Sequence, residues 1–117
     1  MESEKRLAMR RVVSIFISMF FSSIAHAELT IAIWQQNKQL WTTHIAGIGT
    51  GLQWANTAME QAGQNPLYCP PGKLGLTVEN DQSILEDTRK RHPKQEKTTP
   101  IGLLLLIGYR ETFPCGK

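Results

Sequence analysis

The chain has 117 residues, of which 41% are hydrophobic and 20% are charged, and its formal net charge is +3. This length and balance suit one small soluble domain. Much of the positive charge lies near the N-terminus, so the net charge of the whole chain does not by itself indicate the kind of partner.

The N-terminus has the pattern of a secretory signal peptide. Basic residues precede an apolar run at 12–24, which is followed by Ala25-His26-Ala27. A basic region, a short apolar region and an A-x-A site are typical of export and cleavage. We therefore expect residues 1–27 to be removed after Ala27 and domain 28–117 to be periplasmic. The run is too short to favour the alternative, an uncleaved anchor, and either Met1 or Met9 suits the start of translation.

Cleavage changes the charge balance of the protein. Four of the 13 Lys and Arg residues and two of the 10 Asp and Glu residues lie in 1–27, so the mature domain has nine bases and eight acids. A net charge of +1 does not predict binding to nucleic acid or to an anionic membrane.

The mature domain contains two cysteines, Cys69 and Cys115. Because an exported chain folds in an oxidising compartment, this pair predicts one disulfide. Closing a loop of this length would contribute about 4 kcal/mol on the chain-entropy account. No histidine stands at zinc-ligand spacing from either cysteine, so neither a metal site nor a cofactor is expected.

A long helix is predicted over about 39–62 and ends at Gly63. Its apolar stripe has alternating steps of four and three, and comprises Trp41, Ile45, Ile48, Leu52, Ala55, Met59 and Ala62. The opposite, polar face carries Gln53, Asn56, Thr57, Glu60 and Gln61. Glycines at 47, 49 and 51 weaken the helix, so we expect a close approach of another helix or a bend there. A phosphate-binding loop is disfavoured, since no strand precedes these glycines and no Gly-Lys-Ser/Thr follows.

A second helix is predicted from a Thr77 cap to about Arg91, after a loop over 63–75 that is rich in proline and glycine. Its solvated face carries Glu79, Asp81, Glu86 and Asp87 first, and then Arg89, Lys90 and Arg91. That order suits the helix dipole, and His92-Pro93 ends the helix.

The third predicted helix begins at Thr99-Pro100, where the threonine hydroxyl can cap, and ends before Pro114. Six of the seven residues in 101–107 are large aliphatics. A helix that is apolar nearly all round is expected to be enclosed by other elements. The predicted fold is therefore all-α, a small helical bundle stapled by one disulfide.

No group of residues in the mature domain predicts an active site. His44 and His92 belong to no H-E-x-x-H motif, and Ser83 has no G-x-S-x-G sequence around it. Glu86 and Asp87 are adjacent on a helix and do not face each other. We therefore expect a binding protein and not an enzyme.

The C-terminal half has a distinctive pattern. It reads Tyr68-Cys69-Pro70-Pro71-Gly72, a helix ending in Arg91-His92-Pro93, and an apolar helix closing in Phe113-Pro114-Cys115. Together with the glycine-containing helix upstream, this pattern resembles the Rap/Tai family of small periplasmic immunity proteins, over about 41–115. The resemblance implies an all-helical protein with its two cysteines bonded. It also implies that the protein binds and blocks a cell-wall amidase secreted by the type VI system, in some members as a homodimer.

The chain departs from that family in two respects. Members often carry another cysteine upstream of the glycine helix, whereas residues 34–39 here contain none, and three glycines are more than usual. The effector-binding residues vary within the family, so none is carried over. From the residues alone, we expect the short charged turn at 91–97 to contact the partner. Its candidate contacts are Arg91, His92, Lys94, Gln95 and Glu96, and the alternative is an ordinary solvated connection.

A second function of another class is a periplasmic acid-stress chaperone of the small, disulfide-bonded, all-helical type. Such a protein exposes apolar surface when acid loosens it. A neighbouring gene for a secreted amidase would favour the immunity function, and suppression of aggregation in acid would favour the chaperone.

Overall fold

The structure is a computed structural model, which describes residues 2–7, 28–72 and 75–116. Residues 2–7 are helical, and the expected signal-peptide apolar run and cleavage site at 12–27 lie outside the described residues. The domain consists of α2 (Ile31–Gln36), the 3-10 helix η1 (Lys38–Trp41), α3 (Thr42–Gln61), α4 (Val78–Arg91) and α5 (Ile101–Thr112). The described residues form no strand, so the all-α prediction is confirmed.

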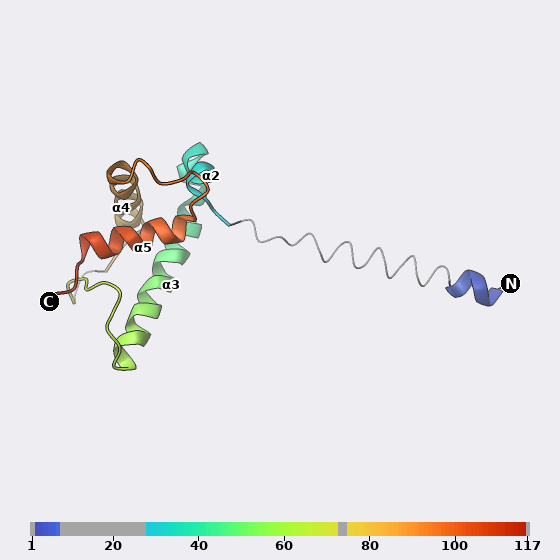
Figure 1. Cartoon of the computed structure of the whole chain (residues 1–117), viewed down its shortest axis with the longest axis horizontal. Helices are drawn as coiled ribbons and strands as arrows, with labels where there is room; N and C mark the ends of the chain where they lie inside the picture. Colours follow the sequence, from blue (N-terminus) through green and yellow to red (C-terminus); the bar gives the residue numbers. More distant parts are fainter. Residues whose placement is uncertain (1, 8–27, 73–74, 117) are drawn as a thin grey trace.

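Helices α3, α4 and α5 each contact the other two and form one core. Figure 1 shows α5 lying across α3 and α4, with α2 at the end where the α4–α5 loop passes. The largest side chains in the core are fully buried: Trp34, Ile45, Tyr68, Leu85, Ile101, Leu104, Leu105 and Tyr109. Every helix from α2 to α5, and the loop before α4, therefore contributes to one core.

Most of the observed boundaries of α3 and α4 lie close to those predicted from the sequence. Thr77 caps α4 in a capping box with Asn80, and His92 is the C-cap residue, as predicted. Helix α3 ends before Gly63, whose φ of 71° lies in the left-handed region that glycine adopts most readily. Its start is later than predicted, because the Asn37 side chain accepts a hydrogen bond from the Leu40 N–H and holds 38–41 as a 3-10 turn.

Helix α2 was not predicted from the sequence. It has six residues, and the Thr30 side chain accepts a hydrogen bond from the Ile33 N–H at its start. The fully buried side chain of Trp34 holds this short helix against the core, and its indole N–H donates to Gln82 of α4. So short a helix depends on tertiary packing, which local sequence patterns do not reveal.

Two expectations about α5 are wrong. The N-cap residue is Pro100, with no side-chain cap, and the Thr99 hydroxyl instead accepts a hydrogen bond from the Gln95 amide. The helix is also not enclosed all round, because Leu103 is 47% exposed. The other helices cover only one side of α5, so its uninterrupted aliphatic run leaves part of the opposite side in solvent.

The predicted faces of α3 and α4 also need correction. Ala55 and Ala62 of the apolar stripe are exposed, whereas Asn56 of the polar face is only 5% exposed. On α4, Asp81 of the predicted solvated face is only 2% exposed. Both polar side chains are buried because they have hydrogen-bond partners in the core, and residue type alone does not predict such partners.

The close helix approach expected at the glycines occurs at one of the three positions. A side chain at Gly49 would meet the Asp81 carboxylate and lie 2.9 Å from the Tyr109 hydroxyl, whereas Gly47 and Gly51 have nothing within 4 Å. Gly49 therefore lets α4 and α5 place these two polar groups directly against α3.

Candidate functional site

The segment predicted to contact a partner connects α4 to α5, and residues 91–97 are called the contact loop below. Arg91 is the last residue of α4 and His92 caps it. The residues after them turn back across α2 before α5 begins. Figure 1 places this loop at the opposite end of the view from the C-terminal end of α3.

Backbone hydrogen bonds hold the contact loop at both ends. Within it, the Gln95 N–H donates to the His92 carbonyl at 3.1 Å, and the Thr99 N–H donates to the Glu96 carbonyl at 2.9 Å. The Ala32 N–H of α2 donates to the Lys97 carbonyl at 3.0 Å. Since the unpredicted helix α2 supplies this last bond, it helps to fix the loop's conformation.

The adjoining segment is fixed in the same way. The Ile31 N–H donates to the Thr99 carbonyl at 3.0 Å, and the Ile101 N–H donates to the Leu29 carbonyl at 2.8 Å. These bonds flank an isolated bridge between Thr30 and Pro100. A loop tied down in this way loses little conformational entropy when it docks on a partner.

Two of the predicted residues contact Glu111 of α5, Arg91 as an ion pair and His92 through a hydrogen bond. The Glu111 carboxylate lies 2.6 Å from His92 Nε2 and 3.3 Å from Arg91 Nη2. Arg91 also donates to the Thr88 hydroxyl. These side chains are one-third to one-half exposed, so each pair contributes at most about 1 kcal/mol to stability. Their main effect is to orient the Arg91 and His92 side chains.

A surface depression of about 360 Å³ lies on this loop. Its lining residues are Arg91, His92, Pro93, Lys94 and Gln95. The structure thus brings four of the five predicted contact residues around one hollow. The exposed Lys94 side chain makes no ion pair or hydrogen bond within the described part of the chain, so its ammonium group is available to an outside carboxylate.

The remaining predicted residues have a more local role. Glu96 does not line the depression, and its side chain accepts a hydrogen bond from the Thr98 hydroxyl. Gln95 is half-buried, and its amide donates to Thr99 at 3.1 Å. We therefore infer that Gln95 and Glu96 mainly stabilise the loop and contribute less to the contact surface.

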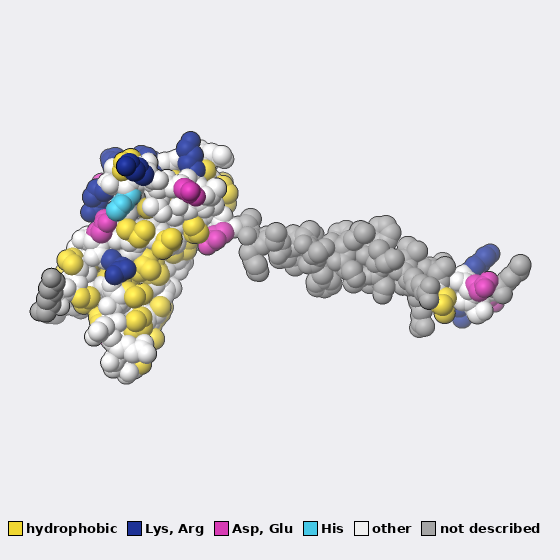
Figure 2. All heavy atoms as spheres, viewed as in Figure 1, with side chains coloured by type: hydrophobic (Ala, Val, Ile, Leu, Met, Phe, Trp, Pro, Cys, Tyr) yellow, Lys and Arg dark blue, Asp and Glu magenta, His cyan; other side chains and the backbone are white. Residues whose placement is uncertain are grey.

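Basic side chains gather around the loop. Figure 2 shows Lys and Arg side chains over the end of α4 and the loop that follows it, with few acidic side chains among them. The bases there come from α4 and the loop, and comprise Arg89, Lys90, Arg91, Lys94 and Lys97. Although residues 28–117 together are nearly neutral, this end of the domain suits an acidic partner surface.

The predicted disulfide is present and joins the loop before α4 to the C-terminal segment after α5. Cys69 and Cys115 are bonded, with their Cα atoms 4.8 Å apart and 46 positions apart in sequence. The Cys69 N–H also donates to the Phe113 carbonyl at 2.8 Å. The bond joins the loop before α4 to the residues that follow α5, so it restrains the ends of both helices.

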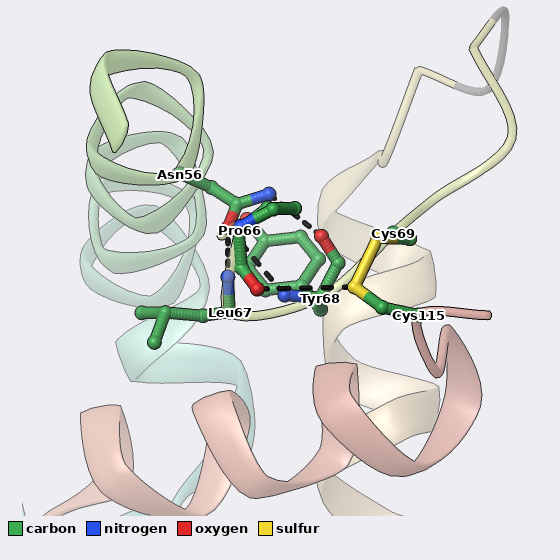
Figure 3. Close-up of a disulfide and its surroundings, with 6 residues drawn as sticks. All are labelled: Asn56, Pro66, Leu67, Tyr68, Cys69 and Cys115. Atoms are coloured by element: carbon green, nitrogen blue, oxygen red, sulfur yellow. Dashed lines mark hydrogen bonds between the residues drawn. A yellow bond between two sulfur atoms is a disulfide. The ribbon is translucent and has the colours of Figure 1, made fainter. Parts of the chain in front are cut away.

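Asn56 is a structural residue that the sequence analysis assigned to the wrong face. Figure 3 shows it reaching from α3 to the loop that carries Cys69. Its amide donates to the Tyr68 carbonyl at 2.8 Å, and its oxygen accepts from the Leu67 N–H at 2.7 Å. One buried side chain therefore satisfies the backbone groups of two loop residues next to the disulfide.

Comparison with known proteins finds no matching family model, no matching curated protein and no matching solved structure. Within residues 2–7, 28–72 and 75–116, no three His, Cys, Asp or Glu side chains lie together as metal ligands would. None of the helices in those ranges has the length and apolar character needed to cross a bilayer. The assignment of function therefore depends on the geometry of the contact loop and the sequence resemblance.

Proposed function

We propose that this protein is a periplasmic immunity protein that binds and inhibits a type VI-secreted peptidoglycan amidase. The observation that carries the proposal is the contact loop, an exposed basic loop that is hydrogen-bonded at both ends to a disulfide-closed helical domain. A loop restrained in this way can dock at the cleft of an enzyme at low entropic cost. The resemblance of residues 41–115 to the Rap/Tai family supplies the class of partner.

The chemistry of the loop indicates how it would bind. Lys94 presents an ammonium group that has no partner within the described residues, and Arg91 and His92 are held by Glu111 at the wall of the same depression. Such a group suits carboxylates at the rim of the partner's cleft, because opposite charges speed association and fix orientation. The apolar core takes no direct part in this binding mode.

Co-expression tests the proposal. A secreted amidase encoded beside this gene is directed to the periplasm, with and without this protein, and survival of the cells is measured. We expect the protein to restore growth only when residues 12–27 are retained, because a cytoplasmic copy cannot reach its target. Protection by a variant that lacks residues 12–27 would contradict a periplasmic role.

The contact loop is tested separately with alanine variants. Replacing Lys94, Gln95 and Glu96 together by alanine should weaken binding of the amidase. The matched control replaces Gln61, Gln64 and Asn65, which are exposed at the far end of α3, and should bind as the wild type does. Equal binding by both triple variants would reject the loop assignment and leave the immunity function itself intact.

A further inference from the structure

The core of the domain contains a carboxyl group that the proposed function does not use. Asp81, on α4, is 2% exposed. Its only side-chain hydrogen bond within the described residues comes from the hydroxyl of Tyr109 on α5. No Lys, Arg or His in that part of the chain forms an ion pair with it. A carboxyl group buried without a cation is costly to keep charged.

The groups around Asp81 come from every element packed against it. Helix α3 presents Gly49, which has no side chain, and the amide of Gln53, which lies against the Tyr109 hydroxyl. The loop before α4 presents Tyr68, whose ring centroid lies 4.8 Å from that of Tyr109. The Tyr68 hydroxyl is buried and has no hydrogen-bond partner among the described residues. None of these neighbours carries a positive charge.

Asp81 lies in the first turn of α4, where the helix dipole offsets part of the cost of burying its charge. Its own N–H donates to the Thr77 carbonyl. Burial raises the pKa of the Asp81 carboxyl, and the hydrogen bond from Tyr109 lowers that pKa only in part. Burial raises the pKa of Tyr68 to about 12, and the charge of Asp81 adds to this rise.

We propose that Asp81, Tyr109 and Tyr68 form an acid-stabilised cluster that joins α4, α5 and the loop before α4, so that protonation of Asp81 tightens the core. The proton binds to a carboxylate oxygen and removes a buried negative charge that no cation among the described residues compensates. The cluster therefore makes this fold more resistant to unfolding as its surroundings become acidic.

The direction of the pH effect follows from proton linkage. Because the pKa of Asp81 is higher in the folded than in the unfolded chain, its contribution to stability is full below the unfolded pKa, about 3.9. The contribution is lost as the pH rises through the folded pKa. Between the two values, each unit of acidification multiplies the folded-to-unfolded ratio by up to about tenfold for this group.

The test is urea unfolding of the mature protein between pH 7.5 and 4.5, followed by tryptophan fluorescence. Wild type is compared with Asp81→Asn, which keeps the size of the side chain and cannot titrate. We expect the ratio of the two folding constants, wild type over variant, to rise as the pH falls, by up to about tenfold per unit within the window. A ratio that is flat, or that falls with acidification, would overturn the proposal.

Asp87→Asn is the matched control, because Asp87 is an exposed carboxylate on the same helix. The Asp87→Asn variant should follow the wild-type pH profile, including any loss of the surface pair between Lys38 and Glu86 and of the contacts that Glu111 makes with Arg91 and His92. If Asp81→Asn does not fold, carbon-13 NMR of wild type measures the Asp81 carboxyl directly. A titration above the usual carboxyl range is expected, and one at or below that range would reject the cluster.

Tyr109→Phe separates the hydrogen bond from burial. The Tyr109 hydroxyl donates to Asp81, and this bond favours the charged form. Its removal should therefore move the Asp81 titration to a still higher pH. An unchanged or lower titration point would show that Tyr109 does not tune this carboxyl group.

Discussion

At the residue scale, buried polar side chains position the loops of this protein. Asn56 and Asp81 were both expected on solvated faces, because their residue types are mostly exposed in proteins. Each lies in the core instead, where a loop backbone or a tyrosine hydroxyl satisfies its hydrogen bonds. Such partners come from other elements of the fold, so helical periodicity in one segment cannot reveal them.

Replacement of Asn56 by alanine should destabilise the domain. The change leaves the buried Tyr68 carbonyl and the part-buried Leu67 N–H without their partner. We expect the free energy of unfolding to fall by about 2–4 kcal/mol, measured by urea denaturation. Asn65→Ala, at an exposed position in the same loop, is the control. A loss no larger than that of Asn65→Ala would contradict the role assigned to Asn56.

Alanine substitutions at Gly49 and Gly47 together test the close approach of the helices. Gly49→Ala places a methyl group against Asp81 and Tyr109 and should cost about 1–3 kcal/mol. Gly47→Ala meets no atom within 4 Å and should instead stabilise α3, by up to about 1 kcal/mol. Thermal unfolding of both variants measures the difference. Equal shifts of Tm would show that α4 does not press on Gly49.

At the element scale, the sequence predicted the long helices well and the short one not at all. Periodicity and caps identified α3 and α4, including the Thr77 cap and the Gly63 stop. Helix α2 has only six residues, and its stability comes from the buried Trp34. The α5 face was mispredicted because an uninterrupted aliphatic run does not show which side its neighbours cover.

The candidate site was predicted in part. The composition of 91–97 marked an exposed, charged loop, and the structure gathers Arg91, His92 and Lys94 around one depression. The ion pairs with Glu111 and the hydrogen bonds from α2 could not be predicted. Both depend on how α5 and α2 pack against the end of α4.

The disulfide should account for a large share of the stability of so small a domain. Cys69→Ala combined with Cys115→Ala should lower the free energy of unfolding by about 2–5 kcal/mol, because the unfolded chain regains freedom. The measurement is urea denaturation with and without reductant. Reductant should destabilise wild type by a similar amount and leave the double variant unchanged. Two free thiols in periplasmic material would contradict this role.

At the scale of the whole molecule, the proposed immunity function requires that the protein is exported. We expect the intact mass of the periplasmic product to correspond to a chain that begins at Glu28, since the A-x-A site ends at Ala27. Mass spectrometry of the purified protein checks this directly. A product that retains residues 12–24 would make the protein membrane-anchored, and the periplasmic assignment would need revision.

The pH response also separates the two functions considered for the whole molecule. An acid-stress chaperone must loosen and expose apolar surface at low pH. We expect the Asp81 cluster to act in the opposite direction, since protonation removes a buried charge. A domain measured to be more stable in acid would favour the binding protein over the chaperone.

We propose that the folded protein silences a cell-wall amidase through its contact loop. The most direct measurement is the rate at which the purified amidase encoded beside this gene releases fragments from peptidoglycan, with increasing amounts of mature protein. We predict complete inhibition near one equivalent, and weaker inhibition by Lys94→Glu, which reverses the charge in the depression. An undiminished rate with excess folded, disulfide-bonded protein would contradict the claim.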